Sequence, residues 1–434
     1  MSEHLPLLVL LAFFGGALSM PLAGLINRRG PWYVAVISSA LAAAFAFYGL
    51  FHVASHGEVR YAVGNWAPPL GIELLLDPLS AFMLVVIAGI ALVTLLHSRI
   101  AVEREIAGSP VLYYASTLIM LGGFAGIACT ADLFNLYVFL EISALASYAV
   151  LGSSGPRSAV AAFRYLILGT LGASFYLIGV GFIFITTGSL NIADVSAIIA
   201  EIGLTVPVGI GAVLMIVGMM VKFALVPLHQ WLPDVYTEAP SSSSSLVAPL
   251  GTKIAAYVLL RLVMDVFPGD RIEIALLLTD TLAVLGAVAI IWGSVMAIPQ
   301  RNLKRMLAYS SVAQVGYIAL GLGLGTAYGF IGAILHILNH ACMKNCLFMV
   351  SSNLETRGRG VLIENFNASL RKYMPASSAA FTVAAISMIG LPPTAGFFSK
   401  WYLLLGSYEG GHWYFIVVIL ISSLLNAVYF FRIL

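Results

Sequence analysis

The sequence contains very little charge. Of its 434 residues, 9% are Asp, Glu, Lys or Arg, whereas 61% are hydrophobic. Ordinary soluble domains carry about 25% charged residues, so this chain cannot cover a water-facing globular surface. The net charge of +2 at pH 7 provides no basic stripe, which excludes nucleic-acid binding as a main activity.

Cysteine is scarce, and a basic leader is missing. The three cysteines lie inside apolar stretches, which argues against a disulfide framework and against a zinc site. Ser2, Glu3 and His4 do not form the basic leader of a cleavable signal peptide. We therefore interpret residues 4–26 as a first spanning helix that is retained in the mature protein.

Long apolar runs make up most of the chain. A hydrocarbon core of roughly 30 Å is crossed by about 20 helical residues, which predicts an all-α polytopic membrane protein of about thirteen spans in one domain. Residues 188–203 are predicted to form a short amphipathic helix. The predicted spans are residues 4–26, 31–54, 78–97, 110–130, 132–151, 158–187, 204–228, 241–265, 272–298, 305–324, 327–351, 376–405 and 411–434.

The basic residues predict the orientation of these spans. Cytoplasmic loops carry an excess of Lys and Arg. Numbering the faces by crossing parity places most of the 21 basic residues on one face and only Arg60, Arg261 and Arg271 on the other. The first face is therefore predicted to be cytoplasmic, and the N-terminus to lie outside.

Four lysines remain after this assignment, and all of them fall inside predicted helices: Lys222, Lys253, Lys344 and Lys400. A cation at the centre of a transmembrane helix costs about 2.5–3.5 kcal/mol on insertion scales. Four such residues are hard to assign to packing, so we expect them to have a function or a partner.

Glu141 is the expected partner of Lys222. It lies nine residues after Asp132, about 13.5 Å along a helix, which places it near the middle of the membrane. A buried carboxylate needs a cation close by. The pair is either a static salt bridge between two helices or a proton-transfer site in which Lys222 exchanges a proton as Glu141 moves.

His336, His340 and Lys344 lie nearly on one helix face, since their spacing is i, i+4, i+8. A single buried histidine is usually a satisfied core residue, but two histidines and a lysine in line indicate a hydrated proton relay. A metal site is the alternative, because histidines at i and i+4 can bind one metal ion. That face offers no obvious third carboxylate or cysteine.

Prolines predict two interrupted helices beside these lysines. Pro227 and Pro233 flank His229 shortly after Lys222. A second pair, Pro392 and Pro393, precedes Lys400 by about two turns. Each proline frees a backbone carbonyl, which is tolerated at membrane depth where it lines protein or a water-filled cavity. Each proline taken alone could be a simple kink.

The helix order predicts an internal repeat. Predicted helices 4–8 and 9–13 are two sets of five, and the fourth helix of each set is broken and carries a lysine. Five is an odd number, so the second set enters from the opposite face, as in inverted-topology repeats. The predicted segments of the domain are residues 1–109, 110–265 and 272–434, and Lys253 would link the two half-channels.

The same residues give the chain a family resemblance. It resembles the antiporter-like subunits shared by Mrp-type cation/proton antiporters, membrane-bound hydrogenases and respiratory complex I, with motifs most similar to the Mrp D type. The resemblance runs from Asp77 to Arg432. The matching motifs are Asp132–Glu141, Lys222–Asp234, Ala239–Ser241 followed by Lys253, Gln300–Ser311, His336–Lys344 and Gly390–Lys400.

The resemblance implies a role for each buried charge. Glu141 and Lys222 would be the paired charges of the first half-channel, and Lys253 would be the bridging lysine. His336, His340 and Lys344 would form the central relay. Lys400 would be the terminal lysine of the second half-channel.

Two features depart from the family pattern. The family usually continues to a fourteenth helix, so we expect the second repeat to lack its last helix. Asp280 is acidic where the pattern is not, and it is either interfacial or an extra cation ligand at the outer mouth.

The leading hypothesis is a proton-translocating subunit of a multi-subunit Na+/H+ antiporter in a prokaryotic cytoplasmic membrane. Its expected partners are other membrane subunits, the lipid bilayer, H+ and Na+. The alternative is the pumping subunit of a redox-driven hydrogenase or quinone oxidoreductase. The sequence has no cofactor-binding motif and no predicted metal site, so any catalysis would lie in partner chains. No nucleophile–base pair supports a separate intramembrane enzyme.

Overall fold

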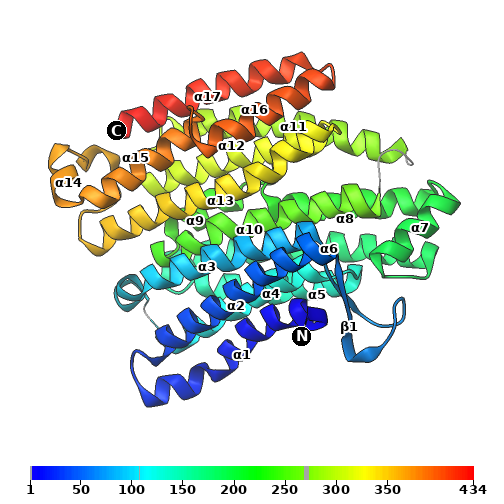
Figure 1. The fold of residues 1–434 in the computed structure, drawn as a ribbon. Coiled ribbons are helices and arrows are strands. Elements are labelled where there is room, and N and C mark those ends of the chain that lie inside the picture. Colours follow the sequence, from blue (N-terminus) through cyan, green and yellow to red (C-terminus); the bar gives the residue numbers. More distant parts are fainter. Residues whose placement is uncertain (1, 107, 268–272) are drawn as a thin grey trace. The chain divides into compact units, whose positions relative to one another are not determined.

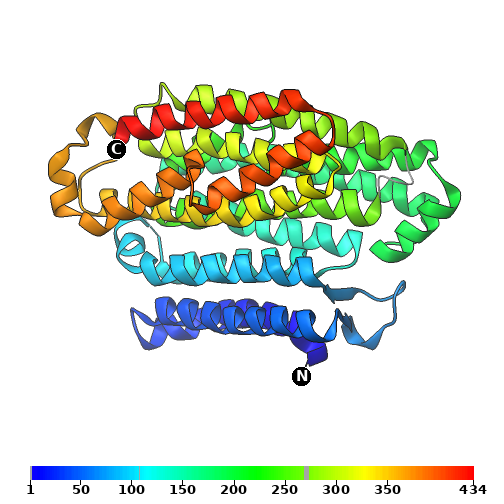
Figure 2. The same cartoon turned by 45° about the horizontal axis from the view of Figure 1, so that its top comes forward.

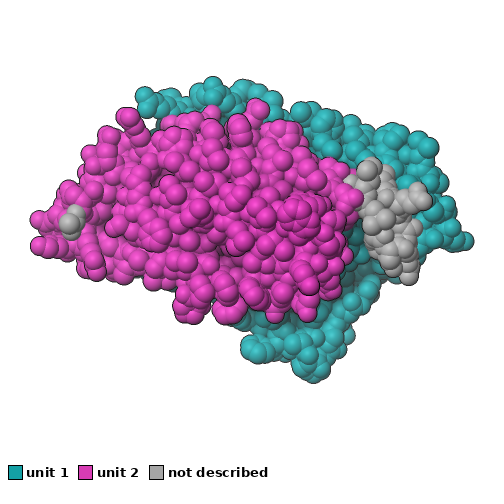
Figure 3. Space-filling view, turned by 90° about the horizontal axis from the view of Figure 1, so that it is seen from above, with its two compact units in different colours: residues 1–219, 257–274 teal, residues 220–256, 275–434 magenta. Residues whose placement is uncertain are grey.

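The computed structural model describes residues 2–106, 108–267 and 273–434, so Arg271 lies outside the described residues. The chain divides into two compact units (Figure 3). Unit 1 comprises residues 1–219 and 257–274, and unit 2 comprises residues 220–256 and 275–434. The predicted division into an N-terminal segment and two five-helix repeats stays a prediction.

The polytopic helical fold is confirmed. Within the described residues, 12 helices are long and apolar enough to cross a membrane. Large apolar side chains cover their outer faces, for example Leu18, Ile185 and Leu424. A helical protein in water would place polar groups there.

The predicted span 376–405 is interrupted. It forms two shorter helices, α15 (Pro375–Ile389) and α16 (Ala395–Glu409). The predicted span 204–228 likewise ends early, as α8 (Val206–Phe223). The short helix α9 (Trp231–Glu238), which the apolar pattern does not reveal, follows it.

Unit 1 contains a helical layer and a hairpin. Helix α2 packs against α1 and α3, and α4 packs against α1 and α5. Strands β1 and β2 pair antiparallel, with Val59 opposite Leu76 and Ala62 opposite Glu73. The hairpin extends beyond the ends of α1 and α2 (Figures 1 and 2). The elements that begin in this unit are α1 (Leu5–Ile26), α2 (Gly30–His56), β1 (Val59–Ala62), β2 (Glu73–Leu76), α3 (Pro78–Glu105), α4 (Pro110–Cys129), α5 (Leu133–Leu151), α6 (Pro156–Thr187), the predicted amphipathic helix α7 (Ile192–Ile202), and α8.

Unit 2 is built around α13. This helix packs against α12, α15 and α16 (Figure 1). The buried residues His336, His340 and Lys344 of α13 are therefore surrounded by other helices of the same unit. The remaining elements are α10 (Ser241–Arg261), the π-helix η3 (Leu262–Val266, in unit 1), α11 (Glu273–Ala297), α12 (Leu303–Gly323), α13 (Ala327–Thr356), α14 (Ala368–Tyr373) and α17 (Trp413–Ile433).

Small residues allow α11 and α12 to approach closely. A Cβ at Gly286 would lie 2.8 Å from the Gly316 carbonyl oxygen, and a Cβ at Gly316 would lie 2.6 Å from that of Gly286. Both distances are too short for any side chain. Membrane helices often use small residues in this way, because close packing replaces the hydrophobic driving force that lipid cannot supply.

Polar caps define where several helices begin. Asp77 accepts a hydrogen bond from the Ser80 N–H (2.8 Å) and Asp132 accepts one from the Asn135 N–H (2.7 Å). Such caps satisfy N–H groups that have no partner inside the helix. Asp132, a secondary candidate from the sequence, thus has a structural role at the start of α5.

Candidate functional site

Most of the predicted site residues lie in unit 2 and are buried. Lys253 in α10 and Lys344 in α13 are fully buried, and Lys400 in α16 is 4% exposed. Lys222 lies in the last turn of α8 and is 6% exposed. No carboxylate forms a salt bridge with Lys253, Lys344 or Lys400 in the described part of the chain.

Lys400 fills the break between α15 and α16. Its ammonium donates to the carbonyl oxygens of Met388 (3.1 Å) and Ile389 (2.9 Å) at the end of α15. Gly390 ends α15 in the left-handed conformation (φ +89), and a Cβ there would lie 2.9 Å from the Lys400 side chain. Glycine is therefore required both for the turn and for the space that the lysine occupies.

Two further side chains complete the surroundings of Lys400. Ser423 of α17 accepts a hydrogen bond from the ammonium (3.1 Å), and the ammonium lies 4.9 Å from the centroid of the Tyr317 ring. An aromatic face attracts a cation electrostatically. Neither residue was predicted, since a serine and a tyrosine in apolar helices are too common to stand out.

His336 connects α12, α13 and α16. Its Nε2 lies 2.9 Å from Oε1 of Gln314, and its Nδ1 lies 3.0 Å from Oγ of Ser399. Both ring nitrogens have partners, so the orientation of the ring is fixed. Ser399 is the neighbour of Lys400 in sequence, which brings the predicted relay close to the terminal lysine.

His340 and Lys344 continue this line along α13. The rings of His336 and His340 are stacked, with centroids 6.0 Å apart. Within the described residues, neither ring nitrogen of His340 has a hydrogen-bond partner. Lys344 donates to the Leu307 carbonyl (2.7 Å) and makes a short hydrogen bond to Ser310. The predicted alignment on one helix therefore places these groups in a buried polar line.

Lys253 lies beside a proline in α10. Its ammonium donates to the Ala248 carbonyl (2.8 Å) and to Thr252 Oγ1 (3.1 Å). Pro249 has no N–H for the carbonyl of Ser245 four residues earlier, and the Asn345 side-chain amide donates to that carbonyl instead (2.8 Å). The amide thus satisfies the backbone group that the proline frees.

The first break is closed differently from the second. The indole N–H of Trp231 donates to the Val221 carbonyl at the end of α8 (2.9 Å). His229 Nε2 accepts from the Trp292 indole (3.1 Å), which identifies a structural contact for this secondary candidate. Pro227 lies between α8 and α9, whereas Pro233 lies in the first turn of α9, where no helical N–H is needed.

The remaining candidates belong to different parts of the chain. Glu141 lies in α5 of unit 1 and Lys222 belongs to unit 2, so their pairing stays a prediction. Asp280 is exposed on α11. Among the described residues, no group of three His, Cys, Asp or Glu side chains is arranged to hold a metal ion.

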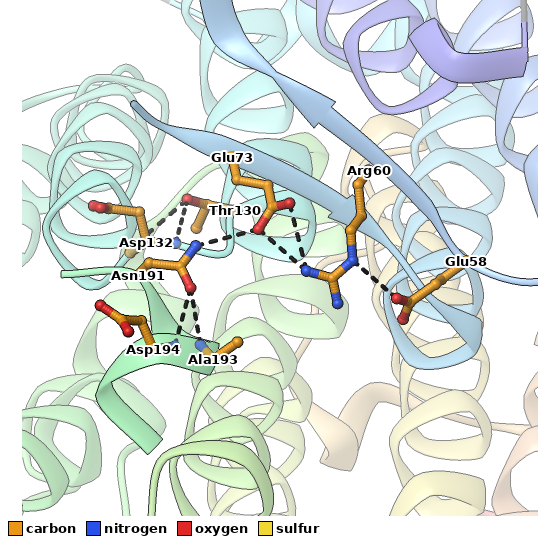
Figure 4. A network of polar contacts seen from close by, with 8 residues as sticks. All are labelled: Glu58, Arg60, Glu73, Thr130, Asp132, Asn191, Ala193 and Asp194. Atoms are coloured by element: carbon orange, nitrogen blue, oxygen red, sulfur yellow. Dashed lines mark hydrogen bonds and ion pairs between the residues drawn. The ribbon is translucent and has the colours of Figure 1, made fainter. Parts of the chain in front are cut away.

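Unit 1 carries a second polar cluster at the hairpin, which the sequence did not indicate. Glu73 accepts hydrogen bonds from Arg60 (3.5 Å) and from the Asn191 amide (3.2 Å). Arg60 also donates to Glu58 (2.9 Å), and Figure 4 shows how these side chains meet. A cavity of about 400 Å³ lies here, and Arg60 and Arg261, assigned by parity to one face, both line it.

Arg261 joins three elements beside this cavity. It donates to Asp77 (2.5 Å), Asp265 (2.8 Å) and the Tyr257 hydroxyl (2.9 Å). The Tyr257 hydroxyl donates in turn to the Ala128 carbonyl (2.6 Å). Burial alone would raise the pKa of Asp77, but the hydrogen bond and charge of Arg261, with the Ser80 N–H, lower it below its ordinary value.

We expect Asp77 to make stability pH-dependent. Its lowered pKa contributes stability that is present above its unfolded-state pKa and is lost as the pH falls through the folded pKa. Asp77→Asn should therefore lower stability by about 2 kcal/mol near neutral pH and remove this acid-side dependence. The measurement is the thermal midpoint of the purified protein as a function of pH. Glu409→Gln, which changes an exposed carboxylate, is the control and should leave the profile unchanged.

Comparison with known proteins adds the family context. Residues 130–426 match the family model described as NADH:quinone oxidoreductase/Mrp antiporter, transmembrane. This range includes every charged candidate of the predicted proton path, from Glu141 to Lys400.

Individual relatives point to two kinds of complex. The N-type subunit of NADH-quinone oxidoreductase from Desulforudis audaxviator is 43% identical and covers 100% of this chain and 86% of its own length. The D-type subunit of the Na(+)/H(+) antiporter from Alkalihalophilus pseudofirmus is 32% identical and covers 88% of this chain and 76% of its own. A chain of the archaeal membrane-bound sulfane sulfur reductase superposes with a TM-score of 0.93 at 32% identity, over 99% of this chain and 87% of its own.

Proposed function

Because the chain belongs to the NADH:quinone oxidoreductase/Mrp antiporter family, we propose that it is a proton-translocating membrane subunit of a redox-driven respiratory complex. It is an antiporter-like, multi-pass membrane subunit that assembles with other membrane subunits. The initial preference for the Mrp D type is weakened, because the quinone oxidoreductase relative is more similar over the whole chain than the antiporter relative.

The buried line in unit 2 is the observation that carries the transport proposal. Lys344, His340, His336 and Lys400 lie inside the protein without a carboxylate salt bridge among the described residues. Ser399, which hydrogen-bonds to His336, directly precedes Lys400 in the sequence. Ammonium and imidazole groups held in low dielectric can change protonation when their surroundings change. A static scaffold does not need cations that are costly to bury.

Protons would pass through these groups in sequence. We propose that they move from Lys222 through Lys253 to Lys344, His340 and His336, and then to Lys400. Motion of Glu141 relative to Lys222 would control the first step. The cytoplasmic membrane and an external N-terminus belong to the same proposal.

The Na+/H+ antiporter is the second candidate, supported by the antiporter relative. Purification of the intact complex from native membranes separates the two. Iron–sulfur subunits and quinone-coupled proton uptake after reconstitution into liposomes would support the redox complex. A complex of membrane subunits alone, in which a Na+ gradient drives proton movement, would contradict it.

A further inference from the structure

The two prolines after α15 free two specific carbonyls. In a continuous helix, residues 392 and 393 would donate their N–H groups to the carbonyls of Met388 and Ile389, four residues earlier. Pro392 and Pro393 have no N–H. The Lys400 ammonium donates to both carbonyls instead, at 3.1 and 2.9 Å. We call this place, with Ser423 and the face of Tyr317, the Lys400 seat.

The Lys400 seat is built to surround one positive charge. Its oxygens come from the carboxyl end of α15, where the helix dipole is negative, and from the Ser423 hydroxyl of α17. The Tyr317 ring adds a cation-attracting face 4.9 Å away. Met388 has one other donor, the Asn426 amide at 3.5 Å. Among the described residues, no carboxylate joins the seat.

Lys344 and the first break differ from this arrangement. Lys344 shares the Leu307 carbonyl with the hydroxyls of Ser310 (2.9 Å) and Ser311 (3.0 Å). The Val221 carbonyl at the first break already accepts the Trp231 indole N–H. Removal of the ammonium at Lys400 would therefore leave the Ile389 carbonyl without a donor and the Met388 carbonyl with only the Asn426 amide, whereas the Leu307 carbonyl would keep two donors after removal at Lys344.

We propose that the Lys400 seat binds a monovalent cation of ammonium size, K+ or NH4+, when the Lys400 side chain gives up its proton and moves out of the seat. Carbonyls at half-helix ends are known ligands for monovalent cations in transporters. Neutral oxygens do not offset a double charge, which disfavours Mg2+ and Ca2+. The present contacts of 2.9–3.1 Å fit an ion of ammonium size, whereas Na+ requires the ligands to move inward. One charge replaces another, so proton release and cation entry are coupled.

This inference rests on the proposed function, because the exchange of a proton for a cation at Lys400 matters only in a transporting protein. Cation binding itself can be measured without transport. The test uses Lys400→Met in the intact purified complex, with Lys344→Met as the matched control. Thermal unfolding midpoints are compared in KCl, NH4Cl, NaCl and choline chloride at equal ionic strength. Ser423→Ala is then added to Lys400→Met to remove one ligand of the seat.

The expected result is specific to one variant. Lys400→Met should unfold about 2 °C or more higher in K+ and NH4+ than in choline, with saturation, because binding stabilises the folded state. Wild type and Lys344→Met should show no such difference. Ser423→Ala in the Lys400→Met background should raise the half-saturating K+ concentration by about tenfold.

Three outcomes would overturn the proposal. The first is an equal thermal unfolding midpoint for Lys400→Met in all four salts. The second is a rise of the Lys344→Met midpoint in K+ and NH4+ equal to that of Lys400→Met. The third is an unchanged half-saturating K+ concentration when Ser423→Ala is added to Lys400→Met. If Lys400→Met is not recovered as a complex, Lys400→Ser is measured in its place and judged by the same outcomes. If the wild-type complex does not pump protons, the proposed function is contradicted, but the binding of a cation to the Lys400 seat is not.

Discussion

Replacement of Lys344 by methionine is expected to lower proton translocation by about tenfold or more, since a positioned proton-transfer group contributes 10²–10⁴-fold. Methionine is flexible, unbranched and uncharged, so it keeps much of the packing while it removes the exchangeable proton. Lys344 is fully buried beside His340, which has no hydrogen-bond partner at either ring nitrogen among the described residues. Without Lys344, the proposed path is interrupted between Lys253 and His340.

The measurement is the initial rate of proton uptake by liposomes that contain the complex, driven by its redox substrate. Lys372→Met, which changes an exposed lysine of α14, is the matched control and should pump as wild type does. Partner-subunit redox activity is measured in parallel, so that loss of assembly is distinguished from loss of translocation. A normal pumping rate in an assembled Lys344→Met complex would falsify the relay.

Reversal of the charge at Glu141 or at Lys222 should lower proton translocation as strongly as Lys344→Met does. Reversal of both charges should restore part of the translocation rate. If the two side chains pair as proposed, Glu141→Lys or Lys222→Glu alone would place two like charges in one low-dielectric region, which costs several kcal/mol at an effective dielectric constant of about 20. The double variant restores opposite charges. The experiment is a double-mutant cycle on the pumping rate, with the amount of assembled complex as a second readout.

The cycle separates a moving pair from a static salt bridge. If the two residues act together in proton transfer, each single reversal abolishes pumping in an assembled complex and the double variant recovers a measurable rate. If they only hold two helices together, the single reversals lose the complex itself. Independent effects of the two substitutions would contradict the predicted pairing.

Much of the helical fold follows from the sequence, because a bilayer imposes a simple length rule on apolar runs. Every long helix that the structure describes corresponds to a predicted span. The hairpin β1–β2 was not predicted, since its strands contain four residues each and alternation over four residues is too short to detect. Helix α9 was not predicted either, because Pro227 and Pro233 made the segment resemble a loop.

The candidate site was predictable only in its charged members. Buried lysines and histidines are conspicuous in an apolar chain, whereas Gln314, Ser399 and Ser423 are ordinary polar residues that distant helices bring to them. One uncharged part of the site did follow from a local rule. The prolines predict freed backbone carbonyls beside Lys400, and the structure identifies the carbonyls as those of Met388 and Ile389.

The kind of complex was the least predictable feature. Redox and antiporter complexes share this type of membrane subunit, and the chemistry that distinguishes them is expected in other chains. The buried lysines and histidines of this chain suit either driving force, so they do not favour one complex over the other. Similarity over the whole chain, rather than any motif, favoured the redox alternative.

Pro249 and Asn345 carry a consequence for how the sequence can evolve. Because the amide of Asn345 serves the Ser245 carbonyl that Pro249 leaves without a donor, the two positions are under a shared constraint. A lineage that replaced the proline would release the asparagine from selection, and one that lost the asparagine first would carry an unsatisfied carbonyl in α10. Substitutions at these two distant positions should therefore be inherited together, with the proline changing first.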